Sequence, residues 1–239
     1  MSFKLTIIRK IKAWFIRLQM NRLVEPFSNI LLNLVYLSKI SKWVSKQKKL
    51  KFNDFYAPVF DYSKRYALYE FVKDEKNLSG KEIIYLEFGV FGGFSFEWWV
   101  KNISHPGARF VGFDTFEGLP EDWGVFKKGD MDARVPRIND FRAQFVKGLF
   151  QETLPGYLLT LDRAKQKVIL MDADLYSSTL YVLTSLAPYL NKGDIILFDE
   201  FNVPRHEFLA FTNFTESFYL RLELIGAANN YYFCAFEVQ

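Results

Sequence analysis

The chain has 239 residues, of which 50% are hydrophobic and 24% charged, so it can fold around a large core and is not a disordered protein. One cysteine excludes an internal disulfide bond, and one cysteine with two histidines excludes a zinc or iron–sulfur site built from those residues. Any metal ion must therefore be held by oxygen atoms.

The positive charge is concentrated in the first part of the chain. Residues 1–51 hold twelve lysines and arginines against one acidic residue, Glu25, which gives +11, whereas 19 basic and 26 acidic residues in the remainder give −7. This asymmetry predicts two parts with different partners. We expect a basic amphipathic helical extension over residues 1–51 and a main domain over residues 52–239, with the lysine-rich residues 46–51 as a linker.

Residues 3–23 alternate cations with apolar residues at helical spacing, as in an amphipathic basic helix. Such a helix can lie on an anionic membrane surface; alternatively, its apolar face packs on the core or on a second copy of the chain. Residues 27–37 are apolar over too short a run to span a bilayer, which takes about 20 residues, and predict a packed helix. The apolar residues of the amphipathic helix at residues 3–23 are Ile7, Ile8, Ile11, Trp14, Phe15 and Leu18.

The location and macromolecular partners follow from the same segment. Charges interrupt the early apolar residues, so we expect no secretory signal and a cytoplasmic protein, peripheral at the inner face of the membrane if the basic helix binds lipid. No recognised nucleic-acid-binding fold accompanies the cations, so no nucleic-acid partner is expected. A homo-oligomer stays open.

From residue 62 onward, helical and strand-like segments alternate, which predicts a sheet covered on both faces. The last two strand segments are joined by only four residues and must form an antiparallel pair at the sheet edge. The fold class is therefore α/β: a doubly wound Rossmann-like sheet, mostly parallel with an antiparallel C-terminal edge hairpin, plus N-terminal helices. Residues 117–136 form a polar loop, long enough to predict a functional lid. The predicted strands are 82–88, 109–113, 144–148, 167–171, 194–198, 221–226 and 231–238, and the predicted helices are 62–74, one through Trp98 and Val100, 178–190 and 205–219.

Ligands of such a sheet lie beyond the carboxyl ends of its strands. After the first main strand the glycines of residues 89–95 let the backbone approach a ligand, and Glu87 stands where a dinucleotide-binding pattern has its first glycine. Asp114 ends the next strand, where an acid can accept hydrogen bonds from ribose hydroxyls. An ammonium group joined to a nucleoside fits both acids, which predicts S-adenosylmethionine. The alternatives are a capping or ion-paired role for Glu87 and an ordinary loop acid at Asp114.

A second group of acids follows the strands at 167–171 and 194–198. Asp172 and Asp199 end strands expected to lie about 5 Å apart, so their carboxylates can converge on one cation with Glu200. Oxygen ligands select Mg²⁺ or a similar ion such as Mn²⁺. Alternatively, Asp174, Ser177 and Ser178 only cap the following helix, but that leaves Asp172 and the adjacent acid pair unexplained.

The chain from about residue 60 to 239 resembles the macrocin O-methyltransferase family, metal-dependent enzymes that methylate sugar hydroxyls. The matching motifs are Glu87-Phe88-Gly89-Val90 with Gly93 and Ser95, Phe113 to Pro120, Gly148-Leu149-Phe150 with Thr153-Leu154-Pro155, Asp172 to Thr179, and Phe198-Asp199-Glu200. The resemblance implies that Glu87, Gly89, Gly92, Gly93, Ser95 and Asp114 bind S-adenosylmethionine, with Gly148 bordering the adenine, and that Asp172, Asp199 and Glu200 hold the metal ion.

The expected reaction is methyl transfer to a hydroxyl of a small-molecule or glycan acceptor, with coordination to Mg²⁺ lowering the pKa of that hydroxyl. Asp172 belongs to this catalytic set, and His206, then Asp174, are the candidate bases. This sequence departs from the family in having Glu200 after Asp199 and no histidine directly behind that pair. Two alternatives are a glycosyltransferase that uses Asp172-Ala173-Asp174 to hold a metal and a nucleotide sugar, and a non-catalytic cofactor-binding module.

Overall fold

The structure, a computed structural model, describes residues 3–239. The chain consists of two compact units, of which the first ends at Ser45 and the second covers Lys46–Gln239. The first unit contains two helices, α1 (Phe3–Arg17) and α2 (Asn21–Val44). Within the described residues, no helix is long and apolar enough to cross a membrane.

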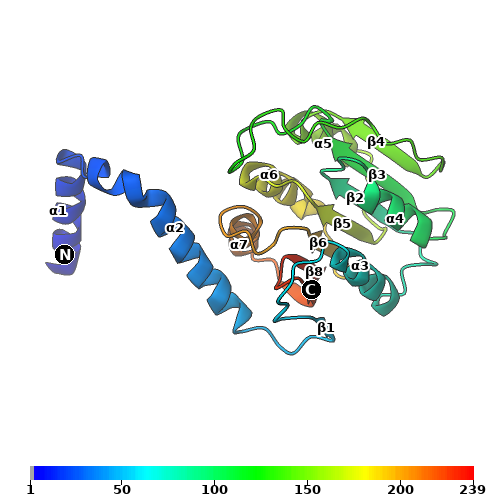
Figure 1. Cartoon of the computed structure of the whole chain (residues 1–239), viewed down its shortest axis with the longest axis horizontal. Helices are drawn as coiled ribbons and strands as arrows, with labels where there is room; N and C mark the ends of the chain where they lie inside the picture. Colours follow the sequence, from blue (N-terminus) through cyan, green and yellow to red (C-terminus); the bar gives the residue numbers. More distant parts are fainter. Residues whose placement is uncertain (1–2) are drawn as a thin grey trace. The chain divides into compact units, whose positions relative to one another are not determined.

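The second unit is built on one sheet of eight strands in the order β1-β7-β8-β6-β5-β2-β3-β4 (Figure 1). The central strands all run parallel, and β8 pairs antiparallel with both β6 and β7. The two-residue strand β1 continues the sheet beyond β7, as a parallel neighbour. The strand bounds are β1 Phe52–Asn53, β2 Ile84–Phe88, β3 Arg109–Asp114, β4 Ala143–Lys147, β5 Lys167–Met171, β6 Ile195–Phe198, β7 Leu222–Ala228 and β8 Phe233–Val238.

Helices cover both faces of this sheet. On one face, α3 (Lys64–Glu75) and α4 (Phe94–Asn102) share a core with alternate strand residues such as Tyr85, Val168 and Leu197. On the other face, α7 (Glu207–Phe218) packs through Phe211 on Phe198 and lies beside α6 (Tyr176–Leu186), which in turn lies beside α5 (Phe150–Leu158). Each central strand is buried on both sides, as the near-continuous apolar strand sequences require.

The predicted fold class is confirmed, including the antiparallel pair near the sheet edge. Two details differ. The sequence did not predict α5, because Pro155 and Gly156 lie inside it and both disfavour a helix interior. The helix expected to reach residue 190 ends as α6 at Leu186 and continues only as a short 3-10 turn over Ala187–Tyr189, where Pro188 removes a backbone donor.

Candidate functional site

A cavity of 620 Å³ opens at the carboxyl ends of β2, β3, β5 and β6, where the parallel topology places the loops that follow these strands. Its lining combines the acids predicted at the strand ends with residues of α3, α5 and the long loop after β3. The lining residues are Tyr62, Arg65, Gly89, Phe91, Asp114, Thr115, Gly118–Glu121, Met131, Leu149–Gln151, Asp172–Asp174, Ser177, Ser178, Asp199 and Glu200.

The first wall of the cavity is the glycine turn, residues 89–93, between β2 and α4. Gly89 has φ +90°, and a Cβ atom there would lie 1.8 Å from the backbone oxygen of Asp172, so only glycine fits. Gly93 has φ +78° and packs against Pro136. At Gly92, an added Cβ atom would meet the ring of Phe94. The turn therefore brings bare backbone to the cavity and joins the ends of β2 and β5.

Asp114 fixes the conformation of the glycine turn. Its Oδ2 accepts hydrogen bonds from the backbone N–H groups of Val90, at 2.7 Å, and Phe91, at 2.8 Å, while Oδ1 accepts one from Phe116 at 2.8 Å. The side chain lines the cavity with its carboxylate already oriented by three donors. Asp114 thus holds the turn in shape in addition to offering acceptor oxygens to a ligand.

Glu87 is buried in the core, whereas Gly89 of the same motif lines the cavity. It has the same strand parity as Tyr85 and is 1% exposed in the core below α3 and α4, where its Oε2 accepts a short hydrogen bond from the Tyr85 hydroxyl. Burial raises the pKa of Glu87 well above its usual range. The Glu87 carboxyl is therefore a buried group beneath the glycine turn, and it does not line the cavity. Ser95 is likewise buried, with Tyr69 within 3.4 Å of its hydroxyl.

The second wall is the acid cluster, Asp172, Asp174, Asp199 and Glu200, at the ends of β5 and β6. Burial raises the pKa of each of these groups, and their mutual repulsion raises the pKa of Asp172, Asp174 and Asp199 further. The Asp172 and Asp199 carboxylates both lie within 3.8 Å of the Arg65 guanidinium. The predicted convergence of these side chains is what the parallel pairing of β5 with β6 produces.

Arg65, in the first turn of α3, supplies positive charge to the acid cluster. One guanidinium nitrogen lies 2.9 Å from Asp199 Oδ2 and the other 3.8 Å from Asp172 Oδ2. The guanidinium also lies over the rings of Tyr62 and Phe233, which hold it in place. Arg65 precedes every motif, so no motif in the sequence pointed to it. The signal that could have found it is charge balance, since buried acids need a cation.

The acid cluster fits a hard divalent cation by its chemistry. Among the described residues, Asp199 Oδ1 and Glu200 Oε2 are buried without a hydrogen-bond partner, which leaves lone pairs available. Glu200 Oε1 accepts a hydrogen bond from Tyr232, and the Glu200 N–H donates to the buried Glu207. Across residues 3–239, however, no three acidic, histidine or cysteine side chains are arranged as a ready metal site. In this structure the guanidinium of Arg65 supplies positive charge to the cluster.

The two candidate bases differ in position. Asp174 lines the cavity in a left-handed backbone conformation, φ 56°, which aspartate tolerates better than most residues. His206 lies at the start of α7 outside the cavity lining, and burial lowers its pKa, so the ring is neutral at pH 7. The centroids of the His206 and Trp123 rings lie 6.1 Å apart in an edge-to-face arrangement, which connects His206 to the long loop.

That loop, residues 117–136, is folded on itself and contacts the site at several points. Gly118 packs against the backbone of Gly129. The backbones of Glu117 and Asp132 form an isolated antiparallel β-bridge across the loop. Glu121 accepts a hydrogen bond of 2.7 Å from Ser177 of α6, within the cavity lining. Gly148, with φ +140°, does not line the cavity itself but directs the following residues Leu149 to Gln151 into it.

Comparison with known proteins finds a protein family that matches the residues around this site. A family described as "Methyltransferase domain" matches residues 86–201, which include the glycine turn, Asp114 and the acid cluster. A curated relative is 8-demethyl-8-(2,3-dimethoxy-alpha-L-rhamnosyl)-tetracenomycin-C 4'-O-methyltransferase from Streptomyces olivaceus, 28% identical over 110 residues. The alignment covers 38% of this chain and spans only 41% of that relative.

Solved structures show the same fold. The calicheamicin methyltransferase CalS11 superposes with a TM-score of 0.56 at 23% identity, covering 85% of this chain and 91% of that chain. Its apo structure, described as a TDP-rhamnose 3'-O-methyltransferase, gives a TM-score of 0.51 at 25% identity and covers 74% and 78%. The O-methyltransferase NovP gives a TM-score of 0.56 at 18% identity and covers 88% and 98%.

Proposed function

We propose that this chain, in which residues 86–201 match a methyltransferase domain, transfers the methyl group of S-adenosylmethionine to a hydroxyl group of a sugar or glycan-like acceptor. The resemblance to the macrocin O-methyltransferase family, expected from the motifs, is confirmed by the family match and by the sugar O-methyltransferases among the relatives. The observation that carries the proposal is the glycine turn, held by Asp114, which opens onto the same cavity as the acid cluster.

The methyl donor fits the first wall of this cavity. Backbone N–H groups at the start of α4 and the bare backbone of Gly89 allow close approach of a polar ligand. Asp114, whose carboxylate is oriented by backbone donors, is placed to accept hydrogen bonds from ribose hydroxyls. Phe150 and Leu149, which line the cavity beyond Gly148, offer an apolar contact for the adenine.

The acid cluster serves the acceptor. A divalent cation such as Mg²⁺, when held by Asp172, Asp199 and Glu200, would supply Lewis-acid stabilisation of the acceptor oxygen. Asp174 is the first candidate for the general base because it lines the cavity and because burial and Asp172 raise its pKa. His206 is the second candidate. It ranks below Asp174 because it does not line the cavity.

The test is calorimetric titration of the purified chain with S-adenosylmethionine, with and without Mg²⁺. Asp114→Ala should weaken binding at least about tenfold, since it removes both the acceptor and the support of the glycine turn. Asp74→Ala is the matched control, because that acid is exposed on α3 and lies outside the cavity lining. Saturable binding of a nucleotide sugar in place of S-adenosylmethionine would contradict the proposal and favour a glycosyltransferase. Weak binding that does not depend on Asp172 would favour a non-catalytic module.

Two further partners are proposed: a small-molecule acceptor, and a surface that residues 1–51 contact. A small-molecule sugar acceptor is consistent with the relatives, whose descriptions name rhamnosyl groups. Residues 1–51 precede the matched residues, and for them the charge pattern supports contact with an anionic membrane surface or with a second copy of the chain.

A further inference from the structure

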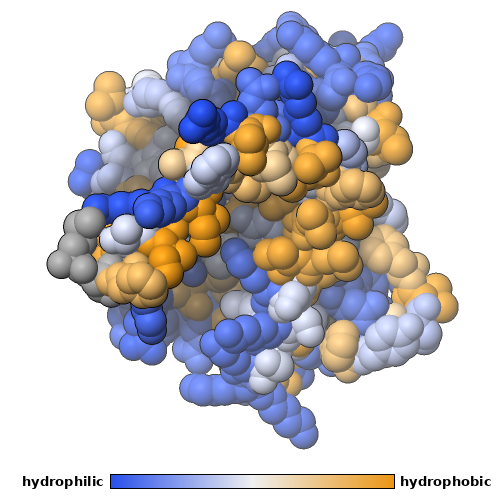
Figure 2. Space-filling view, turned by 90° about the vertical axis from the view of Figure 1, so that its left-hand side faces the viewer, coloured by the Kyte–Doolittle hydropathy of each residue, from blue (hydrophilic) through white to orange (hydrophobic). Residues whose placement is uncertain are grey.

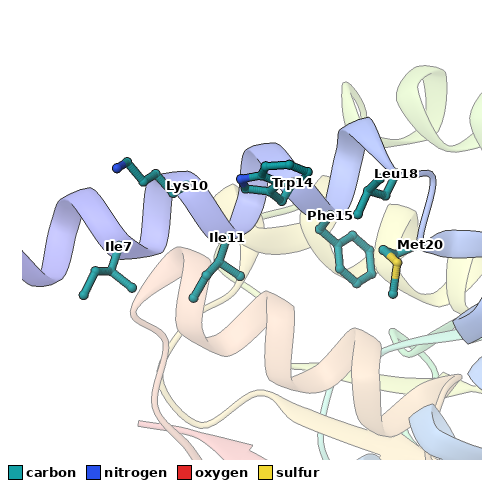
Figure 3. A pocket seen from close by; sticks show the side chains of 7 residues that line it. All are labelled: Ile7, Lys10, Ile11, Trp14, Phe15, Leu18 and Met20. Carbon is teal, nitrogen blue, oxygen red and sulfur yellow. The ribbon is translucent and has the colours of Figure 1, made fainter.

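The N-terminal helix α1 exposes an apolar stripe along one side. At 100° per residue, seven of its apolar residues fall within an arc of roughly 140°, which also contains Lys4, whereas Leu5, Ala13 and Ile16 lie outside it. In Figure 3, Ile7, Ile11 and Phe15 point to the same side of the helix, whereas Lys10 points to the opposite side. None of the helix is buried, and Ile11 is 61% exposed. The stripe consists of Phe3, Ile7, Ile8, Ile11, Trp14, Phe15 and Leu18.

Helix α2 carries a second stripe of the same kind. Eight apolar residues fall on one side by the same helical spacing, opposite Asn29 and Asn33. They are Leu23, Val24, Phe27, Ile30, Leu31, Leu34, Val35 and Leu37. All eight are exposed, and Ile40 is the single buried residue of this described helix. On the face shown in Figure 2, patches of hydrophobic residues are bordered by hydrophilic ones. Exposed stripes of this length indicate an interaction surface.

The charges of these helices indicate the partner. On α1, Arg9, Lys12 and Arg17 lie on the arc opposite the stripe, and the described helix contains no acidic residue. Two copies that met through these stripes would bring together two segments of +11 each, which repel. A bilayer rich in anionic lipid attracts the same cations and accepts the apolar side chains, with Trp14 at the interface.

We propose that α1 and α2 dock the protein on an anionic lipid surface, lying in the interface with their apolar stripes toward the acyl chains. The two stripes act together, since a single weak anchor gives only marginal, reversible binding. The proposal does not depend on the methyl-transfer function, because no residue of α1 or α2 lines the cavity of the second unit.

The test is co-sedimentation of the full chain with phosphatidylcholine vesicles, with and without phosphatidylglycerol. The variant Ile11→Glu/Phe15→Glu places two carboxylates on the apolar stripe. The matched control Thr6→Glu/Ala13→Glu adds the same charge to the same helix on its polar arc. The wild type should bind vesicles that contain phosphatidylglycerol, less at high salt. The stripe variant should lose at least about tenfold in affinity and the control much less.

Three outcomes would overturn the proposal: no binding of the wild type to anionic vesicles, equal losses in the two variants, or equal binding to neutral vesicles. Light scattering after gel filtration identifies the alternative partner. If the stripe variant changes the oligomeric state but not vesicle binding, the stripe is an interface between copies and the lipid proposal fails. Titration of both variants with S-adenosylmethionine reports on the proposed function separately.

Discussion

Replacing Arg65 by methionine tests whether its guanidinium is what allows the acid cluster to exist. Methionine keeps an unbranched side chain of similar reach but removes the charge. In the wild type the guanidinium lies 2.9 Å from Asp199 Oδ2, and the Arg65 and Asp199 side chains are only 16% and 5% exposed. The change therefore leaves the Asp199 carboxylate buried, next to Asp172, with no cation to compensate it.

The expected loss of stability follows from that burial. Removing one partner of a buried ion pair costs about 3–5 kcal/mol. We expect the low end, about 3 kcal/mol, because protonation of Asp199 relieves part of the penalty. In a domain of this size that corresponds to a drop in melting temperature of about 6–12 °C at neutral pH. In the variant the folded-state pKa of Asp199 rises further, so the deficit shrinks as the pH falls toward the unfolded-state value.

Thermal unfolding followed by circular dichroism at pH 7.5 and pH 5 measures both effects. Lys101→Met is the matched control: it removes a cation of α4 whose pair with Glu97, at 2.8 Å, has side chains that are 68% and 48% exposed. Exposed pairs contribute little, so the control should melt near the wild type. Equal melting temperatures for the two variants at pH 7.5 would refute the role given to Arg65.

Two further substitutions test the glycine turn and the group beneath it. Gly89→Ala should destabilise the fold by more than about 4 kcal/mol, or abolish it, because its Cβ would lie 1.8 Å from the backbone oxygen of Asp172; Gly156→Ala, with nothing within 4 Å, should leave the melting temperature unchanged or raised. Tyr85→Phe should cost about 1–3 kcal/mol in urea unfolding, because it removes the hydroxyl that donates to buried Glu87; an unchanged midpoint would contradict that pairing.

Much of the site could be predicted from the sequence because parallel strands deliver their carboxyl ends to one edge. Asp114, Asp172 and Asp199 each follow a run of apolar residues, so the strand assignment alone was enough to bring them together. Their chemistry also followed, since neighbouring buried acids raise one another's pKa. What the sequence could not give is the partner that balances them.

For Glu87, the alternation of side chains along the strand predicts its position better than the motif does. The motif places an acid next to the glycine turn, whereas the two-residue period of a strand places Glu87 on the same side as Tyr85, toward α3 and α4. The alternation was visible in the sequence and would have predicted a buried carboxyl. For Arg65 the signal is charge balance alone, which predicts a cation near the acids but not which one, because Arg65 reaches them only through the packing of α3 against β7 and β8.

The close approach at Gly89 joins the two walls of the cavity into one structural unit. The backbone oxygen of Asp172 occupies the space that a side chain at residue 89 would need, so the glycine turn and the acid cluster cannot shift independently. Asp114 fixes the other side of the turn through the amides of Val90 and Phe91. Methyl transfer requires donor and acceptor to be held in line, and this pairing of β2 with β5 provides such a fixed relation between the two halves of the site.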